Sequence, residues 1–108
     1  MKFKVNFIST AEEDLFEIYK YVYVNDSEET ADKLFSRLYE KCLSLQKYPA
    51  RGHIPPELDI LGINEFLEIT PKPYRIIYQI INNTVFVHCI LDGRRDMQKI
   101  LHDRLIRE

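Results

Sequence analysis

Two strongly apolar runs, residues 74–81 and 84–91, are separated only by Asn82 and Asn83. A connection of two residues between such runs predicts an antiparallel hairpin. Asparagine suits the turn because it tolerates the positive φ that a tight hairpin requires. β-Branched and aromatic side chains dominate both runs, as is typical of strands. This hairpin constrains the fold most, because the remaining elements must pack against the sheet that it begins.

Two further segments are strand-like. Residues 3–7 alternate apolar and polar side chains, which predicts a short strand with one buried face. Residues 65–70 form another run, and Pro71 and Pro73 limit its connection to the hairpin to a turn. We therefore expect three consecutive antiparallel strands, a meander, in the second half of the chain.

The segment between the first strand and the meander has apolar residues at helical spacing. Thr10 and Glu13 fit a capping box, which predicts a helix that begins here. Asp26 or Ser27 is expected to cap a second and longer helix, which should end before Pro49 because a residue before proline avoids the helical region. The short connection predicts an antiparallel helical hairpin that packs one shared face on the sheet.

The end of the chain, residues 96–107, is compatible with a helix capped by Asp96. Residues 49–62 contain three prolines and two glycines and are expected to form an irregular loop. The element order is strand, helix, helix, antiparallel meander and terminal helix, with the helices on one face of the sheet. This order predicts the α+β class rather than a doubly wound parallel sheet. A length of 108 residues fits one domain, 1–108.

Composition and charge exclude several classes of function. The net charge of −2 provides no global basic field of the kind that a general nucleic-acid binder uses. No apolar run approaches the roughly 20 residues of a membrane span, and the alternating N-terminal residues predict no signal peptide. Cys42 and Cys89 lie far apart in apolar stretches, which favours two buried free thiols in a reducing cytoplasm over a disulfide.

The sequence predicts no cofactor and no metal site. It contains no Walker loop, dinucleotide fingerprint, zinc pattern or nucleophile elbow. His53, His88 and His102 are spread along the chain, and none has a metal-ligand neighbour at helical or hairpin spacing.

Arginines of the C-terminal half are the strongest candidates for function. Arg75 interrupts an apolar strand, and Arg94 and Arg95 follow the last strand. The rigid guanidinium suits recognition of phosphate or carboxylate, and strand-end residues on a rigid sheet often form binding sites. The alternative is that surface pairs, Arg75 with Asp92 or Arg95 with Asp96, only hold the loop in place.

His88 is the histidine most closely associated with the predicted sheet. It alternates with Phe86 and Ile90, so we expect all three side chains on one face. Two interpretations remain open: a core histidine with its hydrogen bonds satisfied, or an acid/base group on the sheet. The second requires Arg75 or Arg95 nearby.

Five segments of the chain, taken together and in order, resemble the RelE/ParE superfamily of toxins, which belong to type II toxin–antitoxin (plasmid stabilisation) systems. These segments are residues 11–18, 45–52, 56–58, 73–80 and 90–96, the last of which contains Gly-Arg-Arg-Asp. The resemblance covers nearly the whole chain. It implies a cytoplasmic toxin that is encoded beside an antitoxin, and the antitoxin wraps the toxin and masks its working surface.

The resemblance implies one of two activities. RelE-like members cleave messenger RNA inside the ribosome, and ParE-like members bind DNA gyrase and stall replication. For the ribonuclease, Arg75, Arg95, His53 and His88 would be the catalytic candidates. However, Leu101 stands where those enzymes usually place a tyrosine, and the central loop is poor in basic residues.

We therefore expect a ParE-like inhibitor of DNA gyrase that is not an enzyme. The resemblance makes Arg75, Arg94 and Arg95 its target-binding residues. One alternative is a ribosome-dependent messenger RNA endoribonuclease. The other is a non-toxic member of the superfamily that only binds its antitoxin.

Overall fold

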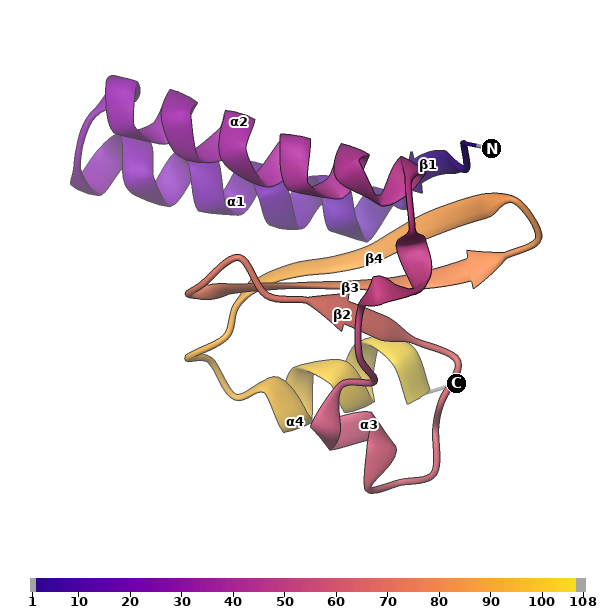
Figure 1. Cartoon of the computed structure of the whole chain (residues 1–108). Helices are drawn as coiled ribbons and strands as arrows, with labels where there is room; N and C mark the ends of the chain where they lie inside the picture. Colours follow the sequence, from indigo (N-terminus) through magenta and orange to yellow (C-terminus); the bar gives the residue numbers. More distant parts are fainter. Residues whose placement is uncertain (1, 107–108) are drawn as a thin grey trace.

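A four-stranded sheet with helices on both faces forms the molecule (Figure 1), and the computed structural model describes residues 2–106 of it. Met1 and the predicted helix end at Arg107 lie outside the described residues. The strand order is β1-β4-β3-β2, with β1 parallel to β4 and the other neighbours antiparallel. The strands are β1 (Lys4–Phe7), β2 (Leu67–Ile69), β3 (Tyr74–Ile81) and β4 (Thr84–Asp92). The predicted meander and the α+β class are confirmed.

The turn between β3 and β4 has the predicted geometry. Asn82 has a φ of 55°, and Ile81 pairs with Thr84 across the turn. β2 is shorter than the predicted run over 65–70. At the edge of the sheet, an isolated antiparallel bridge pairs His53 with Glu68 of β2.

The helices α1 (Ser9–Asn25) and α2 (Glu28–Leu43) form the predicted hairpin over one face of the sheet. The predicted capping box is wrong, because α1 begins where β1 ends. Ile8 still donates its N–H to the Val87 carbonyl while its own carbonyl accepts from Ala11, so Thr10 already lies inside the helix. At α2 the side chain of Ser27 caps the helix by accepting the N–H of Thr30, one of the two expected caps.

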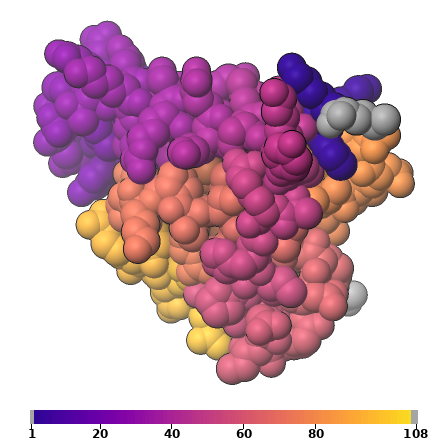
Figure 2. All heavy atoms as spheres, viewed as in Figure 1, coloured from indigo at the N-terminus to yellow at the C-terminus, as the bar shows by residue number. Residues whose placement is uncertain are grey.

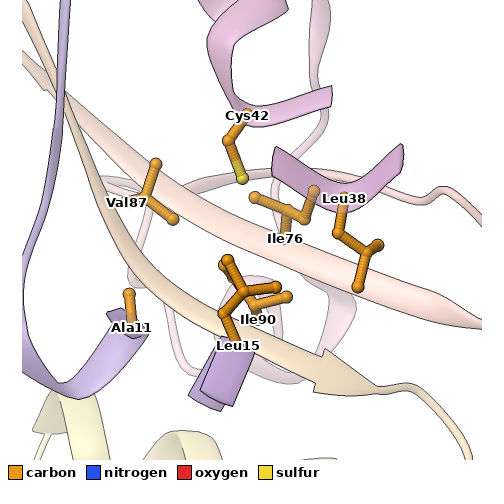
Figure 3. Packing of buried hydrophobic residues seen from close by; sticks show 7 residues of the cluster. All are labelled: Ala11, Leu15, Leu38, Cys42, Ile76, Val87 and Ile90. Carbon is orange, nitrogen blue, oxygen red and sulfur yellow. The ribbon is translucent and has the colours of Figure 1, made fainter. Parts of the chain in front are cut away.

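The principal core lies between the helical hairpin and the sheet. Small and branched side chains of α1 and α2 interdigitate with those of β3 and β4, and this packing excludes water from both layers (Figure 3). The cluster consists of Ala11, Leu15, Leu38, Cys42, Ile76, Val87 and Ile90.

The other face of the sheet is covered as well. The helices α3 (Pro56–Asp59) and α4 (Met97–Leu101), followed by the π-helical turn η3 (His102–Ile106), pack there. The prediction of helices on one face only is therefore wrong. Its physical reason is that β3 and β4 carry apolar residues on both faces, so both must be buried. The second cluster consists of Leu58, Phe66, Ile77, Cys89, Leu91, Met97 and Leu101.

Short helical turns replace part of the expected loop. Between α2 and α3 lie the 3₁₀ turns η1 (Ser44–Gln46) and η2 (Pro49–Arg51). At the other end of the chain, Asp96 caps α4 as predicted by accepting the N–H of Lys99. Within the described part of the chain, no helix combines the length and the apolar character needed to cross a membrane.

A β-bulge changes the position of His88. Ile77 pairs with Cys89 and Tyr78 with Val87, so His88 is the extra residue of β4. Ile90 packs in the core between the helical hairpin and the sheet. The His88 ring instead lies perpendicular to the Phe66 ring, with 5.2 Å between the ring centroids, and Phe66 belongs to the cluster on the other face of the sheet. The prediction that His88 and Ile90 share a face is therefore wrong, because the bulge shifts the alternation by one residue.

Candidate functional site

A buried carboxylate, Glu68, lies at the centre of an ion network on the α3 side of the sheet. Only 2% of the Glu68 side chain is exposed. Arg75 donates its Nε–H to Glu68 at 2.6 Å and both terminal nitrogens to the carboxylate of Glu57 at 2.8 and 2.6 Å. His53 Nε2 lies 2.9 Å from the other Glu68 oxygen. We call these four residues the Glu68 network.

Local structure explains why these side chains meet. Glu68 in β2 pairs with Ile77 in β3, which places it beside Arg75 on the same face of the sheet. Glu57 lies in the first turn of α3, which Pro56 begins. The bridge between His53 and Glu68 then brings the histidine ring to the same carboxylate.

The electrostatics of the network make Arg75 an anchor of the fold. The hydrogen bonds from Arg75 lower the pKa of Glu57, and the bonds to Glu57 raise the pKa of the guanidinium. The Arg75 side chain is 14% exposed, and all three of its nitrogens are engaged. The suggested pair of Arg75 with Asp92 is wrong, because Asp92 binds Arg94 instead.

A second candidate site lies between α1 and the end of β4. It is a pocket of about 540 Å³, and Arg94, Arg95 and Arg104 line it together with Tyr21 and Tyr74. We call it the arginine pocket. Carboxylates of α1 and β4, those of Asp14, Glu17 and Asp92, also line its walls.

The three arginines of this pocket differ in their partners. Arg94 binds Asp92 through Nε at 2.9 Å and Nη2 at 2.6 Å, and this contact lowers the pKa of Asp92. Arg104 binds Asp14. Arg95 is exposed, and its guanidinium makes no hydrogen bond or ion pair with any residue that the structure describes. It is therefore the arginine of this pocket that is available to a partner.

A row of aromatic rings runs along the helical hairpin to Phe7 of β1, and Tyr23, Phe35 and Tyr39 of this row are exposed. Successive ring centroids lie 6.0, 6.0, 6.0 and 5.4 Å apart. The row, which we call the aromatic ladder, consists of Tyr23, Tyr19, Phe35, Tyr39 and Phe7. Beside it Phe16 is 57% exposed. In the space-filling view the hairpin extends beyond the rest of the molecule (Figure 2). Clustered exposed aromatic surface of this kind marks binding sites for other proteins.

The sequence matches a family model over residues 5–97, and this model describes the ParE toxin of type II toxin–antitoxin systems, parDE. The chain belongs to the ParE toxin family. A comparison with curated proteins gives no match.

Solved structures share the fold of this ParE-family chain. The chromosomal ParDE toxin–antitoxin system of P. aeruginosa matches with a TM-score of 0.69 at 19% identity, over 82% of this chain and 94% of that chain. The RelBE2 toxin–antitoxin complex of Mycobacterium tuberculosis matches with a TM-score of 0.63 at 20% identity, over 85% and 92%. A free double mutant of the E. coli toxin RelE gives 0.60 at 15% identity, over 93% of each chain.

In this ParE-family toxin, the predicted site residues lie in three separate places. Arg94 and Arg95 share the arginine pocket, but Arg75 does not line it. His53 joins Arg75 through Glu68. His88 is half-buried with its Nε2 3.3 Å from Gln79 Oε1, and burial, with a smaller effect of Arg104, lowers its pKa.

Several residues of these sites were missed in the sequence. Glu68 had a detectable signal, because a carboxylate in an apolar strand-like run is as unusual as Arg75 in the next strand. Asp14 and Arg104 had none, since 90 residues separate them.

Among residues 2–106, no group of three or more His, Cys, Asp or Glu side chains is arranged to hold a metal ion.

Proposed function

We propose that this ParE-family toxin inhibits DNA gyrase by binding it, without catalysis, and that a cognate antitoxin silences it. The observation that carries this proposal is the engagement of Arg75 by two carboxylates inside the Glu68 network. An arginine held in this way serves the fold, so Arg75 is not free to act on RNA.

A ribonuclease would need more than the Glu68 network offers. Cleavage by the ribose 2′-OH requires a base, an acid and cations that hold the phosphorane. Arg75, which shares Glu68 with His53, is neutralised, and the two carboxylates of Glu57 and Glu68 surround it and would repel a phosphate. Leu101, where the ribonucleases usually have a tyrosine, is fully buried in the second core.

Arg95 is the residue we assign to the gyrase contact. The purified toxin should inhibit gyrase supercoiling or trap the cleavage complex, and Arg95→Ala should weaken this effect. Lys33→Ala is a matched control, because Lys33 is a cation of the hairpin that is 77% exposed and does not line the pocket. Growth arrest by a toxin that leaves both gyrase activities unchanged would contradict the proposal.

We place the antitoxin on the aromatic ladder, where an apolar helix or extended segment can bury the rings. Phe16→Ser should weaken antitoxin binding measured by calorimetry, since Phe16 is 57% exposed beside a hollow of about 380 Å³ that Tyr19 and Phe35 also line. Ile60→Ser serves as control because Ile60 is 79% exposed on the opposite side of the sheet, just after α3. Equal effects of the two changes would argue against this placement.

The second candidate is a ribosome-dependent endoribonuclease, and the His53–Glu68 pair favours it. A buried carboxylate that orients an exposed imidazole is an arrangement suited to a general base, and His53 is 61% exposed. Primer extension on messages after induction would reveal discrete cuts, and His53→Ala should abolish them. Intact messages exclude this candidate, and expression without a growth defect points to a non-toxic member of the family.

A cytoplasmic site of action is part of the proposal. Cys42 and Cys89 are both free and buried, which is the usual state of thiols in a reducing compartment. The burial raises the pKa of each thiol to about 12, so neither is a reactive thiolate at neutral pH.

A further inference from the structure

Tyr48 combines a strained backbone with an exposed ring. Its φ and ψ are 52° and 53°, which is the left-handed region that residues other than glycine rarely adopt. Its side chain is also 82% exposed, so the ring gains little packing in return. Strained residues of this kind cluster at binding and active sites, which makes Tyr48 a candidate for a role other than stability.

The outer side of the Tyr48 turn is held by Arg51. One terminal nitrogen of Arg51 donates to the carbonyls of Lys47 at 3.0 Å, Ser44 at 3.3 Å and Tyr48 at 3.4 Å. The other donates to the Ser44 hydroxyl at 2.6 Å. Arg51 therefore stabilises the turn that displays Tyr48, which explains its place in a loop with few other basic residues.

The inner side of the turn is held by the sheet. The buried hydroxyl of Tyr78 donates to the Pro49 carbonyl. Gly52 follows, and its Cα lies so close to the sheet that an added Cβ would be 2.7 Å from the Glu68 carbonyl oxygen. Because both sides are fixed, the backbone of the Tyr48 turn is held in one conformation, which lowers the entropic cost of binding to it.

The surroundings of Tyr48 form a basic hollow with an apolar floor. Tyr48 lines a hollow of about 670 Å³ together with Lys2 and Lys47. None of the carboxylates that the structure describes lines it, although Asp and Glu outnumber Lys and Arg in the sequence, 17 to 15. The floor consists of Phe3, Pro49, Ala50 and Ile80. We call this site the Tyr48 platform.

The Tyr48 platform lies at the end of the molecule to which α2 leads. The Phe3 N–H binds the Gln46 carbonyl and the Lys4 N–H binds the Asn83 carbonyl, so the chain start, the exit of α2 and the β3–β4 turn meet there (Figure 1). The aromatic ladder ends on the same side, where Tyr39 stacks on Phe7 of β1.

We infer that the Tyr48 platform binds an acidic segment of the cognate antitoxin, with one apolar side chain of that segment packed on the Tyr48 ring. The inference rests on the proposed antitoxin partner. Lys2 and Lys47 supply the complementary charge, and one partner that covers the aromatic ladder can continue past Tyr39 onto the platform. A nucleic acid fits less well, because two lysines on a chain of net charge −2 neutralise few phosphates.

Tyr48→Gly separates binding from stability. Glycine relieves the left-handed strain, so the melting temperature should stay equal or rise, while the Kd for the purified antitoxin should increase about tenfold or more. Tyr48→Phe should bind as the parent protein does, because it keeps the ring. Ile60→Ala is the control for loss of an exposed apolar side chain remote from the platform, and it should leave the Kd unchanged.

Charge reversal tests the basic rim. The double change Lys2→Glu and Lys47→Glu should weaken antitoxin binding and reduce its dependence on salt, because the attraction between exposed charges is screened by ions. If both this variant and Tyr48→Gly bind the antitoxin as the parent protein does, the inference is wrong and the proposed function stands. If the parent protein itself does not bind the antitoxin, both fail. If Tyr48→Gly weakens binding of a single-stranded RNA oligonucleotide but not of the antitoxin, the platform is a nucleic-acid site and the inference is overturned.

Discussion

Arg104 in η3 binds Asp14 in α1 through two contacts of 3.1 and 2.9 Å. The same carboxylate accepts the N–H of Ile90 at 3.0 Å, and Arg104 donates to the carbonyl of His88 at 2.9 Å. β1 pairs with β4 only as far as Phe7 and Val87, and the last hydrogen bond between this segment and β4 runs from the Ile8 N–H to the Val87 carbonyl. The His88 carbonyl and the Ile90 N–H lie in the part of β4 beyond that point. The ion pair therefore satisfies groups that a longer β1 would have bound.

Removal of Arg104 should destabilise the fold. Arg104→Ala leaves the Asp14 carboxylate, 13% exposed, without its cation and the His88 carbonyl without this donor. We expect the free energy of unfolding to fall by about 2–3 kcal/mol. Urea unfolding measures this loss. Lys99→Ala, which removes an exposed cation of α4, should leave stability within experimental error.

Arg75 and Arg95 should respond in opposite ways to alanine. Arg75→Ala leaves Glu68 buried without its arginine, so we expect a loss of about 3 kcal/mol in the free energy of unfolding. Arg95→Ala should leave unfolding unchanged and lower toxicity, measured as growth arrest at equal protein level. Normal stability of the Arg75 variant would mean that the Glu68 network does not anchor the fold.

Glu57 should contribute to acid unfolding. Its pKa lies below the ordinary value of 4.5 because Arg75 donates hydrogen bonds to the carboxylate. The ionised form is favoured in the folded state, so this contribution is complete above 4.5 and is lost as the pH falls through the lowered pKa. Glu57→Gln should make the melting temperature depend less on pH in this acidic range. An unchanged pH profile in the variant would contradict the prediction.

His88 should make stability depend on pH at a higher range. Burial, and to a smaller extent Arg104, lowers its pKa from the ordinary value of 6.5, so the folded protein holds the ring neutral. Below 6.5 the unfolded chain takes up a proton that the folded chain resists, and stability therefore decreases as the pH falls. Thermal melts of the parent protein and His88→Gln between neutral pH and the acid range should diverge if this is correct.

Gly52 should not accept a side chain. Its φ of −72° is open to any residue, so the obstacle is space: an added Cβ would clash with the Tyr78 hydroxyl and with the Glu68 carbonyl. Gly52→Ala should destabilise the protein by about 1–3 kcal/mol, the usual cost of overpacking. Gly62 provides the contrast, because it has a φ of 74° and open space around it. Gly62→Asn should be tolerated better, as asparagine accepts this conformation.

Much of the fold could be predicted from the sequence because its signals are local. The asparagine pair defined the β3–β4 hairpin, Ser27 was one of the two expected caps of α2, and Asp96 capped α4. Turn chemistry, capping and apolar period act between residues a few positions apart. The candidate site was predicted less well: Arg75 was recognised as unusual, but its partners Glu57 and Glu68 were not.

Contacts between distant parts of the chain were decided only by tertiary structure. The parallel pairing of β1 with β4, the packing of α4 on the far face and the bulge at His88 all depend on the assembled sheet. The apolar stripe of a helix can pack equally well on either face of the sheet, so the sequence pattern of the helix does not predict which face it covers. By itself the sequence determined the strands, the longer helices, their order and the family, but not the short helix α3. The assembled sheet decided that Arg75 anchors the fold and that Arg95 remains available to a partner.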